Sequence, residues 1–120
     1  TFKIMKTLNN IFHYIIGFSF LHAIGNLTDW NEFDNYSKAL AVPILSIIIG
    51  IAIGFGIEAI QDLIVKKGFD NTDIARTTIG AFFGGLTAVL FPNLDLFMWI
   101  SLGVSASLII MELVIILNKK

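Results

Sequence analysis

Residues 39–57 read ALAVPILSIIIGIAIGFGI, with no charged side chain from end to end. A helix of this length covers about 28 Å, close to the thickness of the hydrocarbon core of a bilayer. Three further uncharged stretches are of similar length, at residues 8–27, 77–94 and 96–111. Four such stretches in one short chain predict a multi-span membrane protein.

The composition agrees with this interpretation. Of 120 residues, 56% are hydrophobic and 14% are charged, and the mean hydropathy is +0.82, which is too apolar for a domain whose surface is solvated by water. Four helices with short loops occupy the whole of residues 1–120, so we expect a single membrane domain without a separate soluble catalytic module. The formal net charge of −1 gives no reason to expect a nucleic-acid partner, and the lack of cysteine excludes disulfides and thiolate metal ligands.

The residues that border the apolar stretches set the limits of the expected helices. Lys66, Lys67 and Gly68 form a cationic end with a glycine C-cap, and residues 92–95 read as a tight turn. No small-residue cleavage site follows the first stretch, so we interpret it as a retained span and not as a secretory signal. The fold expected is all-α, a four-span transmembrane helical bundle with spans at about residues 8–27, 39–65, 74–91 and 96–117.

The basic residues predict the orientation. Lys38 alone lies between the first and second spans. The other seven precede the first span, lie between the second and third, or follow the fourth: Lys3, Lys6, Lys66, Lys67, Arg76, Lys119 and Lys120. Cytoplasmic segments carry the excess of lysine and arginine, so both termini are expected to be cytoplasmic and the protein to be a multi-pass component of the cell membrane.

Three ionisable residues fall at one depth inside the predicted spans. His13, Glu58 and Glu112 each lie about 10–12 Å from the cytoplasmic end of their helix. Placing an ionisable group within a span is costly, so each such residue is a candidate for function. A buried ion pair that holds the helices together is the competing interpretation.

Helical spacing adds neighbours to these groups. Steps of three and four residues continue the glycine pair Gly50 and Gly54 into the polar face of the second span, and a similar face on the third span contains Gly80 and Gly84. Small residues four apart allow close helix packing, which is the role expected of these four glycines. The candidate polar pocket consists of His13, Glu58, Gln61, Asp62, Asp73 and Arg76. Within it, Arg76 is the expected partner of Glu58 or Asp62.

Several chemistries find no support in the sequence. No phosphate-binding glycine loop with lysine, Gly-x-Ser-x-Gly elbow or His-Glu-x-x-His motif is present. His13 and His22 share one span and the carboxylates are separated in sequence, so neither a dedicated metal site nor a cofactor is expected.

Four short motifs resemble those of the VanZ-like family of small membrane proteins. They are Asn10–His13 (NIFH), Glu58–Gln61 (EAIQ), Gly68–Asp73 (GFDNTD) and Gly80–Gly85 (GAFFGG). In that family a span ends in Glu-x-x-Gln, an Arg-x-Phe-Asp-like loop follows, and the next span opens with Asn and Gly-x-x-x-Gly. The resemblance covers about residues 13–85.

This chain departs from the pattern in having lysines in place of the loop arginine and Thr77 in place of the asparagine. The resemblance implies a cell-envelope role, since the family's named member is associated with low-level resistance to teicoplanin.

Three function classes remain open from the sequence. The first is a VanZ-like envelope protein whose cytoplasmic-side pocket binds an amphiphile or lipid headgroup, with membrane lipids or a lipid-linked envelope precursor as partner. The second is a membrane enzyme in which His13 and Glu58 form an acid/base pair acting on a lipid-linked substrate. The third is a small four-span transporter or channel, for which a homo-oligomer is expected, and a holin-like protein ranks below these.

Overall fold

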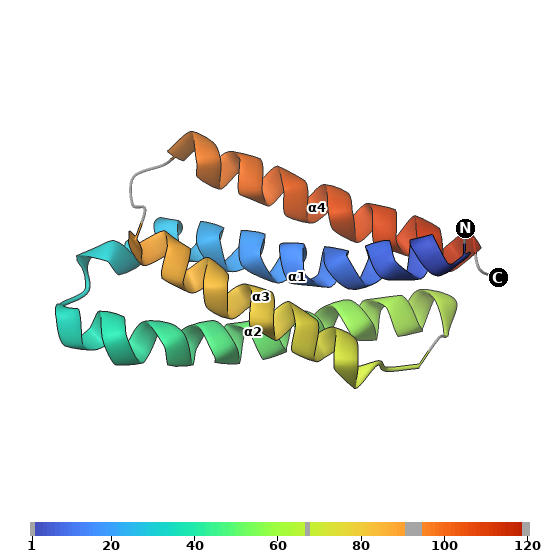
Figure 1. The fold of residues 1–120 in the computed structure, drawn as a ribbon, viewed down its shortest axis with the longest axis horizontal. Coiled ribbons are helices and arrows are strands. Elements are labelled where there is room, and N and C mark those ends of the chain that lie inside the picture. The colour runs from blue at the N-terminus through green and yellow to red at the C-terminus, as the bar shows by residue number, and fades with distance from the viewer. Residues whose placement is uncertain (1, 67, 91–94, 119–120) are drawn as a thin grey trace.

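The computed structural model describes residues 2–66, 68–90 and 95–118. It contains four long helices, α1 (Phe2–Leu27), α2 (Asn35–Val65), α3 (Asn71–Leu90) and α4 (Asp95–Asn118), with a short 3₁₀ turn, η1 (Trp30–Glu32), between the first two (Figure 1). The described residues contain no strand, which confirms the all-α prediction. The tight turn expected at residues 92–95 falls largely outside the described ranges.

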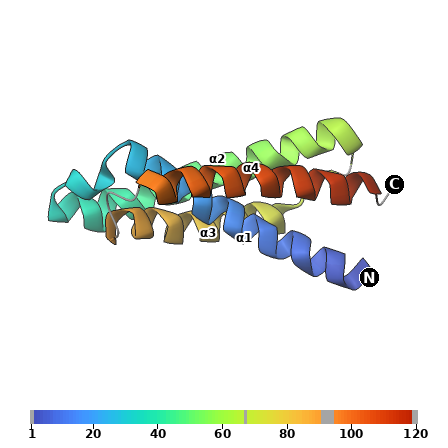
Figure 2. The same cartoon turned by 90° about the horizontal axis from the view of Figure 1, so that it is seen from above.

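The four helices run along the long axis of a molecule that measures 49 × 26 × 23 Å (Figure 2). Helix α3 packs along both α1 and α2, whereas α4 packs mainly along α1. The start of α1, the connection between α2 and α3, and the last turn of α4 lie at the same end of the molecule (Figure 1). We call this the terminal end.

Helix α2 begins earlier than the sequence pattern predicts. The Asp34 carboxylate accepts the backbone N–H of Ser37 at 2.7 Å and so caps the first turn. This hydrogen bond holds the pKa of Asp34 below its usual value. The sequence pattern predicts Pro43 near the start of this helix, but because the cap lies five residues before the expected start, Pro43 is in the helix interior.

The connection between α2 and α3 differs from the sequence prediction in the residues that cap the two helices. Helix α2 ends at Lys66, which adopts the left-handed conformation (φ 52°) and donates its N–H to the Asp62 carbonyl, so the C-cap is Lys66 and not Gly68. Asp70 caps α3, because its carboxylate accepts the N–H of Thr72 at 2.9 Å. The sequence pattern predicts Asn71, Thr72 or Asp73 as the N-cap, but all three lie within the helix, and the cap is the residue before it.

The glycines expected to pack lie at helix contacts. A Cβ on Gly80 or Gly84 would collide with backbone carbonyls of α1, and a Cβ on Gly50 or Gly54 would meet the backbone of α3 at 3.0–3.1 Å. Gly17 of α1, which was not singled out, faces the backbone of α3 in the same way. Glycine is therefore what allows α3 to approach both neighbours closely.

One described helix is long and apolar enough to cross a membrane, by its length and composition. It is α2, over Asn35–Ile64, and α4 contains a shorter apolar segment at Trp99–Val114. The four-span arrangement and the orientation of the termini stay predictions.

Candidate functional site

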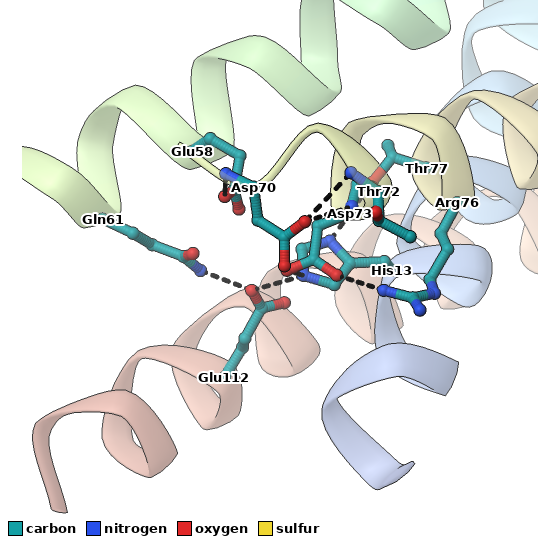
Figure 3. Close-up of polar contacts among 9 residues, drawn as sticks. All are labelled: His13, Glu58, Gln61, Asp70, Thr72, Asp73, Arg76, Thr77 and Glu112. Carbon is teal, nitrogen blue, oxygen red and sulfur yellow. Dashed lines mark hydrogen bonds and ion pairs between the residues drawn. The ribbon is translucent and has the colours of Figure 1, made fainter. Parts of the chain in front are cut away.

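A cluster of buried polar side chains lies among the four helices (Figure 3), near the end of α2, the start of α3 and the end of α4. Every helix contributes to it and no member is more than 5% exposed. We call it the His13 cluster; its members are His13 of α1, Glu58 and Gln61 of α2, Asp73 and Thr77 of α3, and Glu112 of α4.

The imidazole of His13 is at the centre of the cluster. Its Nδ1 lies 3.2 Å from Thr77 Oγ1, and its Nε2 lies 2.8 Å from Glu112 Oε1 and 3.2 Å from Asp73 Oδ2. The Thr77 hydroxyl donates its single hydrogen to the Asp73 backbone carbonyl at 3.0 Å, so it can only accept from His13. This assigns a proton to Nδ1 and turns Nε2 toward the two carboxylates.

Glu112 connects α4 to the rest of the cluster. Its Oε1 accepts the side-chain N–H of Gln61 at 2.6 Å, as well as facing His13. Glu112 was not included in the predicted pocket, although its depth in the fourth apolar stretch was the same as that of His13 and Glu58. The common depth of the three residues in the sequence was the signal by which Glu112 could have been added to the predicted pocket.

Glu58 lies on the α2 side of the cluster and is fully buried. Its Oε1 accepts the backbone N–H of Asp70 at 2.9 Å, which ties α2 to the loop before α3. One side-chain donor atom from each of Glu58, His13 and Asp73 can be chosen so that all three lie within 4.8 Å of one another. The described contacts of the imidazole are with Thr77, Asp73 and Glu112, and the acid/base pairing of His13 with Glu58 stays a prediction.

Arg76 has a different partner from the one expected. Its Nη1 donates to Asp73 Oδ1 at 2.6 Å, one turn away on the same helix, and not to Glu58 or Asp62. The predicted pairing was wrong because the glycine-lined contact of α2 with α3 leaves Arg76 on the side of α3 that faces α1 (Figure 3). The Arg76 side chain keeps 22% of its surface exposed.

Two of the polar residues considered from sequence lie outside the cluster. Asp62 accepts the backbone N–H of Gly68 at 2.6 Å and serves the turn that follows α2, because it points about 100° around the helix from Gln61. His22 is buried more than two turns along α1, where Asn26 Nδ2 lies 3.2 Å from its Nε2.

An apolar groove runs between α1 and α3 beside the cluster. It has a volume of about 320 Å³ and is lined by Tyr14, Ile15 and Phe18 of α1 and by Ile79, Gly80 and Phe83 of α3. Arg76 precedes Gly80 by four residues and Phe83 by seven, so it lies on the face of α3 that forms the groove. The polar pocket expected from sequence is thus two features, a compact cluster of mutually bonded groups and a separate apolar groove with an arginine next to it.

Comparison with family models, with curated proteins and with solved structures finds no match to this chain. The chemistry of the site therefore has to be argued from its own geometry. A cluster of imidazole and carboxylates suits a cation, whereas a partly exposed guanidinium beside an apolar groove suits an anionic amphiphile.

Proposed function

We propose that this chain is a multi-span protein of the cell membrane that binds an anionic amphiphile in the groove between α1 and α3, with the headgroup at Arg76. The amphiphile is a phospholipid or a lipid-linked envelope precursor. The observation that carries the proposal is the position of Arg76 on the groove face of α3.

The distribution of polar and apolar side chains supports a lipid environment. Large apolar side chains are more than half exposed on α2, α3 and α4, for example Ile48, Phe83 and Ile110. The buried interior holds, beside an apolar core, histidines, carboxylates, serines and a glutamine. In water this arrangement is unfavourable, whereas lipid solvates the apolar exterior and disfavours exposed polar groups.

The basic residues support the proposed orientation. The predicted cytoplasmic lysines belong to the chain ends and to the α2–α3 connection, and these segments meet at the terminal end of the molecule (Figure 1). Lys66 is exposed there. A positive end of this kind favours the cytoplasmic side, so we place both termini inside the cell.

Arg76 supports an anionic headgroup as the polar part of the ligand. It lies five residues into α3, about 7.5 Å from the start of the helix, which is the depth at which a long cationic side chain reaches the headgroup region. A guanidinium has five N–H donors, and the contact with Asp73 occupies one nitrogen. The remaining donors can bind phosphate while an acyl chain occupies the groove.

The resemblance to the VanZ-like family supports a role in the cell envelope. The motifs that carry it contain Glu58, Gln61 and His13, which belong to the His13 cluster, and Gly80, which lines the groove. We therefore propose that the chain acts on the envelope through the lipid that it binds.

Native mass spectrometry of the protein released from its own membrane tests this proposal. We expect the wild type to retain an anionic lipid, Arg76→Gln to lose it, and Lys38→Gln, at the opposite end of the bundle, to retain it. Equal lipid retention by all three proteins would contradict the proposal.

A further inference from the structure

We propose that the His13 cluster is a binding site for one divalent transition-metal ion, held by His13, Glu58, Asp73 and Glu112. This inference goes beyond lipid binding, because it concerns the interior of the bundle and not the groove. It reverses the expectation from sequence, where the four residues are far apart and gave only a weak argument for a metal.

The protonation of His13 is the first step of the argument. Thr77 accepts from Nδ1, so Nε2 of the neutral imidazole carries a lone pair. This lone pair faces carboxylate oxygens of Glu112 and Asp73 at 2.8 and 3.2 Å, and Nε2 has no aligned hydrogen bond with any described group. Three electron-rich atoms in contact require a cation between them, either a proton or a metal ion.

The spacing of the donor atoms suits a metal ion. Ligands bound at about 2.1 Å and at right angles are separated by about 3.0 Å, and opposite ligands by about 4.2 Å. The distances from Nε2 to Glu112 and Asp73 match the first value, and one donor atom from each of His13, Glu58 and Asp73 lies within 4.8 Å of the other two. Glu112 adds a fourth donor on the Nε2 side of the imidazole.

Two buried oxygen atoms point to a ligand independently of these distances. Glu112 Oε2 and Gln61 Oε1 are buried and have no hydrogen-bond partner among the described residues. Both belong to side chains that are at most 2% exposed and that bond to each other within the cluster. Glu112 Oε2 is available as a metal ligand, and Gln61 Oε1 can accept from a metal-bound water.

Each ligand is also held by a second group, as in known metal sites. The Thr77 hydroxyl orients the imidazole, Arg76 bonds the second oxygen of Asp73, Gln61 bonds Glu112, and the Asp70 N–H bonds Glu58. An imidazole with several carboxylates suits divalent manganese, iron or zinc better than the softer thiolate-seeking ions. The three carboxylates carry three negative charges, which a divalent ion and the guanidinium of Arg76, bonded to Asp73, together balance.

The experiment is metal binding by the purified, metal-stripped full chain in detergent. The free Mn²⁺ signal is followed by electron paramagnetic resonance, with Zn²⁺ as competitor. We expect the wild type to bind one Mn²⁺ per chain, which Zn²⁺ displaces. Asp73→Asn and Glu112→Gln should weaken binding by about tenfold or more, whereas Asp62→Asn, a matched loss of a carboxylate outside the cluster, should bind as the wild type does.

A second measurement on the wild type does not depend on how the variants fold. X-ray absorption at the zinc edge should show only nitrogen and oxygen ligands at about 2.0–2.1 Å, with scattering from one imidazole. A wild type that binds neither ion, or binds them without imidazole, overturns the proposal and leaves a protonated histidine between carboxylates. Lipid retention measured on the same samples distinguishes this outcome from failure of the lipid proposal. Glu112 does not line the groove, so Glu112→Gln should still retain the lipid, whereas Arg76→Gln should lose it.

Discussion

At the scale of the residue, His13 shows how one side chain joins three helices through its two nitrogens. Nδ1 is directed at Thr77 of α3, while Nε2 faces Glu112 of α4 and Asp73 of α3. The ring is 1% exposed, so none of these contacts is replaced by water if it is lost. The hydroxyl of Thr77 sets the orientation of the ring because it has no hydrogen left to donate toward it.

Thr77→Val therefore tests the role of a single hydroxyl. Valine keeps the shape but leaves the buried Nδ1–H without an acceptor, which should lower the free energy of unfolding by about 1–3 kcal/mol. Thr78→Val is the control, because the Thr78 hydroxyl bonds only its own helix, at the Ile74 carbonyl. The free energy of unfolding of both variants is measured in mixed micelles with increasing SDS. An equal loss for the two substitutions would show that the contact of Thr77 with His13 does not stabilise the fold.

At the scale of the element, α3 is the helix that organises the bundle, because glycines let it lie close to α1 and α2 at the same time. Gly80 and Gly84 face carbonyls of α1, and Gly17 on α1 faces the backbone of α3 in return. This close approach brings Thr77 and Asp73 to His13. The position of the cluster is therefore a consequence of glycine packing two turns further along the helix.

Gly80→Ala should separate α1 from α3. The new methyl group would collide with the Tyr14 carbonyl, which is backbone and cannot rotate away, so we expect a loss of about 3 kcal/mol of stability and weaker contacts of His13. Gly103→Ala on α4 is the matched control, since a Cβ there meets nothing within 4 Å. Thermal unfolding in detergent distinguishes the two, and a Gly80→Ala protein as stable as the Gly103→Ala protein would contradict the proposed packing.

At the scale of the whole molecule, buried polar side chains share the interior with an apolar core, while many large apolar side chains are exposed on the outside. The start of α1, the last turn of α4 and the α2–α3 connection, where Lys66 is exposed, lie at one end of the molecule (Figure 1). The proposed membrane orientation, with this end inside the cell, rests on the excess of basic residues in the sequence near it. The opposite end holds η1 and the acidic residues before α2.

The chain has no cysteine, so single cysteines report the orientation without background. Lys66→Cys should react with a membrane-impermeant maleimide only in inverted vesicles, and Glu32→Cys only in intact cells. Both residues are exposed, so burial does not limit either reaction. Labelling of both positions from both sides would indicate dual topology and contradict the proposed orientation.

The helices and their contact glycines were predictable from sequence, because apolar length and the spacing of small residues are local properties of the chain. The same holds for the common depth of His13, Glu58 and Glu112, which follows from counting residues along each helix. The partners were not predictable in this way. Whether Arg76 meets Asp73 or Glu58 depends on how each helix is rotated about its axis and on how closely the backbones approach. Only the packing of four helices against one another fixes those two quantities, and it is this packing that brought His13, Asp73 and Glu112 into contact and left Asp62 at the turn.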